Sequence, residues 1–158
     1  MLNPTLLLIE RSYQQIESNA DQITDYFFQR LFELEPALKL LLPGEPQVRK
    51  AFVLTALSFI IDNLHQLDVM HLRAQALGHS WVSKGILPIH YEAMRRALLE
   101  SFNQLQSGSI APQAKVAWNE ICTMLANTMK RAAEIELNSA IPLGQNVVKS
   151  QLNRFVGG

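Results

Sequence analysis

The stretch LGHSWVSKGILPIHY, residues 77–91, decides the fold of this chain. Its first half continues a helical pattern that ends at Lys84-Gly85, because glycine readily adopts the left-handed conformation that stops a helix. Its second half begins a new helix at Pro88, whose fixed φ suits the first helical position. The stretch therefore predicts one helix, a tight turn and a second helix, without the alternation of apolar and polar residues that marks a strand.

The same pattern of long helices between rare breakers extends in both directions. No glycine precedes Gly44, and the prolines lie far apart. A short apolar helix is expected after Glu35-Pro36, and the longer helices are predicted at residues 3–18, 19–34, 46–64, 68–84, 88–105 and 112–138. The fold class is therefore all-α, with six to seven helices of unequal length.

The composition indicates one soluble domain. The chain has 158 residues, of which 48% are apolar and 18% charged, and 14 basic residues balance 14 acidic ones. This balance argues against nucleic-acid binding, which needs a basic surface. One cysteine predicts a reducing compartment. We find no signal peptide and no stretch long enough to span a membrane, so we expect a cytoplasmic protein.

The C-terminal residues differ from the rest of the chain. We expect a domain at residues 1–138 and a tail at residues 139–158, in which Lys149 and Arg154 are the only charged residues. Four roles stay open for this tail: a flexible extension, packing on the domain, contact within a homo-oligomer, or binding of a partner.

Five local strings carry a resemblance to a known family. They resemble the globins, specifically the bacterial single-domain and flavohaemoglobin type, over residues 5–137. The strings are residues 27–36, 40–44, 47–52, 77–91 and the pair Ala117-Trp118. The resemblance implies a globin-like fold, a bacterial source and a pocket that in relatives holds haem.

The resemblance also implies where the haem ligand should stand. In this branch the iron-binding histidine lies four residues before the glycine and ten before the tyrosine of the 77–91 stretch. Counting back from Gly85 and from Tyr91 leads in both cases to Trp81. An indole nitrogen donates a hydrogen bond and has no accessible lone pair for iron. We therefore expect that the protein takes no cofactor.

Other positions of the implied pocket are apolar as well. Relatives carry an oxygen-binding tyrosine, a corner aromatic and a distal polar residue where this chain has Phe28, Leu42 and Val48. The tyrosine after the proximal helix is retained. The pocket implied by the resemblance is lined by Phe28, Leu42, Val48, Phe52, Trp81 and Tyr91.

Our first hypothesis is a haem-less globin-like sensor or protein-interaction module rather than an enzyme. Such a protein pairs as a dimer or with another protein through helix faces, and it can hold an apolar small molecule in the former haem pocket. The sequence contains no catalytic motif and no metal-binding spacing. Cys122 lies on an apolar stripe and is interpreted as a buried thiol without a reaction to perform.

The alternative is a haem globin with an unconventional ligand that binds oxygen or nitric oxide. His79 is the best candidate ligand among the four histidines. It lies two residues before Trp81, roughly 200° around a helix, so the proximal helix would have to turn or slip. An absorption spectrum with haem present separates the two hypotheses.

Overall fold

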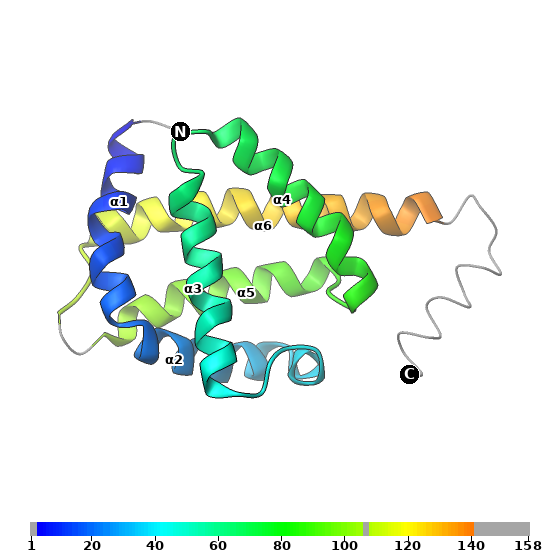
Figure 1. Ribbon diagram of the computed structural model, residues 1–158, viewed down its shortest axis with the longest axis horizontal. Helices are drawn as coiled ribbons and strands as arrows, with labels where there is room; N and C mark the ends of the chain where they lie inside the picture. The colour runs from blue at the N-terminus through cyan, green and yellow to red at the C-terminus, as the bar shows by residue number, and fades with distance from the viewer. Residues whose placement is uncertain (1–2, 106–107, 141–158) are drawn as a thin grey trace.

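Helices make up the regular structure of the part of the chain that the computed structural model describes, residues 3–105 and 108–140. The prediction of an all-α fold is confirmed (Figure 1). The α-helices are α1 (Asn3–Ser18), α2 (Ala20–Leu34), α3 (Pro46–Asp62), α4 (Leu67–Trp81), α5 (Pro88–Ser101) and α6 (Pro112–Ala140). Three short 3-10 helices join them: η1 (Pro36–Leu40), η2 (Val82–Lys84) and η3 (Phe102–Gln104).

The segment that decides the fold forms a helix, a turn and a helix. The α-helix is shorter than predicted, because α4 ends at Trp81 and the following turn tightens into η2. Gly85 closes this turn with a φ of 89°, and its N–H donates to the Val82 carbonyl over 3.0 Å. A residue with a Cβ atom would be strained in this conformation. Pro88 then begins α5.

The close-packed core lies where α1 and α5 pack on α6, with α2 packed on α5 in turn (Figure 1). Trp118 of α6 is fully buried there, and its Nε1–H donates to the Ser12 Oγ over 2.8 Å. The Phe102 ring meets the Trp118 ring edge to face at a centroid distance of 5.6 Å. Buried Trp side chains usually find such a partner for the indole N–H.

Helix α4 approaches α6 very closely at Gly78. A Cβ atom at this position would lie 2.6 Å from the Met129 carbonyl oxygen. The absence of a side chain at Gly78 therefore sets how closely α4 can pack on α6, and with it the position of Trp81 at the end of α4.

Helix α3 is not buried on several sides, although apolar residues are nearly continuous along it. Among its residues only Val53, Leu57 and Ile60 are buried. Ala51, Thr55 and Ala56 of the same helix are exposed and line an open space that is described below. The nearly continuous apolar pattern of α3 therefore serves both the core and a cavity.

No helix within the described residues is long and apolar enough to cross a membrane. The predicted boundary at residue 138 falls within α6, which continues to Ala140, and residues 141–158 of the predicted tail lie outside the described residues. The cytoplasmic location, the dimer and the protein partner stay predictions.

Candidate functional site

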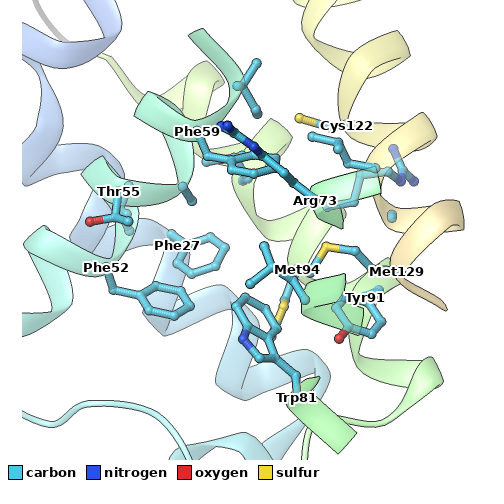
Figure 2. Close-up of a pocket in the computed structure, with 18 of the residues that line it drawn as sticks. Phe27, Phe52, Thr55, Phe59, Arg73, Trp81, Tyr91, Met94, Cys122 and Met129 are labelled. Atoms are coloured by element: carbon cyan, nitrogen blue, oxygen red, sulfur yellow. The ribbon is translucent and has the colours of Figure 1, made fainter. Parts of the chain in front are cut away.

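A cavity of about 930 Å³ lies between α3, α4, α5 and α6 (Figure 2). This is near the upper end of the range for small-molecule sites, ~300–1,000 Å³. Its wall is made of apolar side chains with few polar ones. It is lined by Phe27, Pro43, Val48, Ala51, Phe52, Val53, Thr55, Ala56, Phe59, Ile60, Arg73, Ala76, Leu77, Ser80, Trp81, Tyr91, Met94, Arg95, Leu98, Cys122, Leu125, Ala126 and Met129.

The structure brings most, but not all, of the predicted pocket residues to this cavity. Four line it: Val48, Phe52, Trp81 and Tyr91. Phe28 lies behind the wall, fully buried, with its ring centroid 5.9 Å from that of Phe52. Leu42 packs against the core outside the cavity.

Phe28 lies next to Arg49 and not at the cavity, where the family resemblance implies it. The Arg49 guanidinium carbon lies 5.0 Å from the Phe28 ring centroid and 5.3 Å from that of Phe32. Its Nε–H donates to the Pro43 carbonyl over 2.7 Å. Arg49 thus covers the outer side of these rings and ties α3 to the preceding loop through a cation–π contact and a hydrogen bond.

Trp81 and Tyr91 form one end of the cavity wall. Their rings are stacked, with centroids 6.3 Å apart and an angle of 12° between the ring planes. The Tyr91 hydroxyl is buried and finds no hydrogen-bond partner among the described residues. Burial raises the pKa of Tyr91 to about 12, so the phenol keeps its proton. An unpaired buried hydroxyl costs free energy, and a ligand with a polar atom at this point would satisfy it.

Sulfur-containing side chains form another part of the wall. Met94 of α5, Met129 and Cys122 of α6 all line the cavity (Figure 2). Burial raises the pKa of Cys122 to about 12, which keeps it as a thiol. A thiol is a poor nucleophile and a poor metal ligand compared with the thiolate. The methionines offer neutral thioethers and adaptable apolar surface.

The histidines lie outside the cavity wall. His79, the alternative haem ligand, is partly exposed, and its Nδ1 lies 3.0 Å from a Glu136 carboxylate oxygen of α6. His71 lies near Thr128, with 3.2 Å between Nδ1 and Oγ1. Neither imidazole belongs to the residues that surround the open space.

The other two histidines have structural contacts at helix ends. The exposed His65 pairs with Glu10 of α1. His90 is buried, and its Nδ1 accepts the Leu87 N–H over 2.9 Å at the start of α5. Burial lowers the pKa of His90, which favours the neutral ring that this contact requires.

The cavity wall does not fit iron ligation by histidine. Trp81 stands where the resemblance implies the ligand, and the four histidines lie elsewhere. Tyrosine and cysteine bind haem iron as anions in some proteins, but the raised pKa values of Tyr91 and Cys122 oppose those forms. Within the described residues, no group of three or more His, Cys, Asp or Glu side chains is arranged to hold a metal ion.

Sequence reasoning missed several residues of the wall. Phe59 is one helical turn beyond Thr55 and two turns beyond Phe52 on α3, so the i, i+3 and i+7 spacing could have found it. Met94 follows Tyr91 by three residues on α5, and Met129 follows Cys122 by seven residues on α6, so helical spacing from those two residues could have found both. Arg73 gives no signal in the sequence, because only the packing of α4 beside α3 brings it to the cavity.

Known proteins of similar sequence are haem proteins and reductases by name. The chain is 27% identical over 133 residues to "Anaerobic nitrite reductase NSHB5" of Oryza sativa subsp. indica, covering 78% of this chain and 89% of that protein. It is 24% identical over 144 residues to Leghemoglobin-1 of Lupinus luteus, covering 80% and 94%. It is 26% identical over 125 residues to a flavohemoprotein of Vibrio cholerae, covering 75% of this chain but only 31% of that protein.

The expectation that the protein takes no cofactor is corrected by these relatives. Their names include leghemoglobin and flavohemoprotein, so the family points to haem rather than to no cofactor. The sequence argument failed because an expected replacement at one ligand position does not determine what a cavity of this size receives.

The fold and the family are supported independently. A solved bacterial globin from Campylobacter jejuni superposes with a TM-score of 0.68 at 17% identity, covering 84% of this chain and 96% of that one. At that identity the likeness shows the fold. The family model described as Globin matches residues 25–129. The chain therefore belongs to the globin family.

Proposed function

We propose that this globin is a ligand-binding protein, with a sensing or carrying role, whose cavity takes an apolar molecule of haem size. The observation that carries the proposal is the cavity of about 930 Å³, lined mainly by apolar side chains from α3, α4, α5 and α6. Burial of an apolar ligand there would be favourable by roughly 25 cal/mol per Å² removed from water. Haem is the first molecule to test, since haem proteins are among the relatives.

Retention of such a ligand would depend on shape and apolar contact rather than on an imidazole. The stacked rings of Trp81 and Tyr91 offer a flat aromatic surface, and Met94 and Met129 offer side chains that adapt to a ligand's outline. A binding role is also supported by the chemistry of the wall. Within the described part of the chain, neither a histidine nor a carboxylate, the usual general acids and bases, lines the cavity.

The first test is addition of haemin to the purified protein, followed by absorption spectroscopy. We expect saturable binding of one haemin per chain, or of an apolar molecule found by mass spectrometry of an organic extract. His79→Ala should leave haemin binding unchanged, because His79 pairs with Glu136 outside the wall. Trp81→His should change the spectrum to that of an imidazole-bound haem, because residue 81 lines the cavity.

Two outcomes would contradict the proposal. One is the failure of haemin, extracted lipids and an apolar fluorescent dye to bind in a saturable manner. The other is a haem absorption band that disappears in His79→Ala. It would show that the His79 imidazole, which we assign to the surface, binds the haem iron.

A second candidate function is haem-dependent chemistry on a small molecule such as oxygen, nitric oxide or nitrite. It is favoured by the relatives named nitrite reductase, which match over 78% of this chain. Nitrite consumption by the haemin-loaded protein, compared with haemin alone, tests it. A rate no higher than that of free haemin would leave binding as the function.

A further inference from the structure

Arg73 stands apart from the rest of the cavity wall because it is charged. It lies on α4, and Figure 2 shows its side chain reaching toward Phe59 of α3. Its Nη1–H donates to the Asn63 Oδ1 at the end of α3 over 2.8 Å. The residue itself is exposed. Arg73 therefore joins α4 to α3 beside the cavity while keeping its guanidinium accessible to solvent.

The charges around the cavity do not balance. Among the residues that the structure describes, its lining includes two cations, Arg73 and Arg95, and no aspartate or glutamate. Arg95 is neutralised by Glu92, with 3.0 Å between Nε and Oε2, and it also donates to the Asn119 Oδ1 over 2.7 Å. Arg73 has only the neutral Asn63 amide. Among the described lining residues, Arg73 is thus the one charge without a carboxylate partner.

Asn63 holds Arg73 in place without satisfying its charge. The Asn63 amide nitrogen is fixed by its own bond to the Phe59 carbonyl, over 2.8 Å. Its oxygen takes one of the five N–H donors of the guanidinium, and the planar fork of arginine matches a carboxylate with two parallel bonds. An anion could therefore bind Arg73 while the contact with Asn63 persists.

We propose that the ligand of this cavity carries a carboxylate, which Arg73 binds, while its apolar body fills the space between α3 and α6. This inference rests on the proposed function and deepens it by naming the ligand class. Two kinds of molecule share this chemistry: a long-chain fatty acid, and a tetrapyrrole with propionate groups such as haem. The arms of the experiment distinguish them.

The experiment measures binding of matched acid and neutral ligands by the fluorescence of Trp81. Trp81 lines the cavity, whereas Trp118 is buried elsewhere and bonded to Ser12. Hexadecanoate is compared with hexadecanol, and protoporphyrin with its dimethyl ester, at neutral pH and below the concentration at which they aggregate. Trp81→Phe, measured with the same ligands by equilibrium dialysis, tells whether the signal comes from the cavity.

The matched variants are Arg73→Gln, Arg73→Lys and Arg11→Gln. Arg11 is an exposed arginine of α1 that does not line the cavity. We expect Arg73→Gln to weaken binding of the acid roughly 10–100-fold, the usual effect of losing a charged hydrogen bond. Binding of its neutral partner should be unchanged. Arg73→Lys should keep part of the affinity, and Arg11→Gln should behave as the native protein.

Each outcome decides one point. An acid preference in the hexadecanoate pair identifies a fatty acid, and one in the protoporphyrin pair identifies a tetrapyrrole. Equal affinity for acid and neutral ligand, or equal effects of Arg73→Gln and Arg11→Gln, would overturn the inference while leaving the proposed function intact. If none of the four ligands nor haemin binds, the proposed function itself fails.

Discussion

The two tryptophans of this globin lie in contrasting surroundings. Trp118 is fully buried where α1 and α5 pack on α6, its indole N–H is bonded to Ser12, and the Phe102 ring meets it edge to face. Trp81 is only partly buried, stacks on Tyr91 and borders a cavity of about 930 Å³. One aromatic ring completes a packed core, and the other forms the wall of an open space.

The difference teaches where stability and function reside in this fold. The side around Trp118 gains its free energy from close packing, in which each removed atom leaves a void. The side around Trp81 is packed less closely, because the ring borders the cavity. The unpaired hydroxyl of Tyr91 lies on this side too. Incomplete packing and an unpaired buried hydroxyl lower the stability of the ligand-free protein. A ligand that binds there therefore has the largest stabilising effect.

The largest effect that would test this contrast is truncation of each tryptophan. Trp118→Ala should lower the free energy of unfolding by about 3–5 kcal/mol, because it creates a void in the packed core. Trp81→Ala should cost only about 1–2 kcal/mol, because the ring already borders open space and loses mainly its stack on Tyr91. Urea denaturation followed by circular dichroism measures both.

Where Trp118→Ala does not fold, Trp118→Phe and Trp81→Phe provide the same comparison at smaller magnitude. Equal losses at the two positions would contradict the division into a packed side and an open side.

A smaller effect is expected from the hydrogen bond that anchors Trp118. Ser12→Ala leaves the indole N–H buried without an acceptor, which should cost about 1–3 kcal/mol. Ser18→Ala on the same helix is the matched control, because Ser18 is exposed and bonds only to the Gln15 carbonyl of its own helix. A Ser12→Ala variant as stable as Ser18→Ala would show that the bond adds nothing to the packing.

The smallest effect is expected on the cavity side and has the opposite sign. Tyr91→Phe removes a buried hydroxyl without a partner, so the ligand-free protein should become more stable by about 1 kcal/mol. The pH dependence should change as well. In the unfolded chain Tyr91 ionises near its ordinary pKa of 10.0, while burial raises the folded pKa to about 12.

Because the folded state holds this proton more tightly, the native protein should lose stability as the pH rises from 10.0 toward about 12. Tyr91→Phe should lack that part of the loss. The partly exposed Tyr26 supplies the control variant, Tyr26→Phe. A lower stability of Tyr91→Phe near neutral pH would mean that the hydroxyl has a partner after all.

Much of the fold could be predicted because its signals are local. The turn at Gly85 needs a left-handed residue, and Pro88 begins the next helix wherever it occurs. The candidate site could be predicted only in part. Val48, Phe52, Trp81 and Tyr91 were reached by position along the family pattern and do line the cavity. Phe28 was predicted from the same family pattern but does not line the cavity. Its ring packs behind Phe52 and against Arg49.

The sequence by itself determined the helices and the all-α class, because helix periodicity and helix-breaking residues act within short segments. Only the tertiary structure decided that α3 borders an open space and that Arg73 meets Asn63 of another helix. It also decided that His79 pairs with Glu136 away from the cavity. These features depend on contacts between segments far apart in the chain, such as the close approach of α4 to α6 at Gly78, which no local pattern encodes.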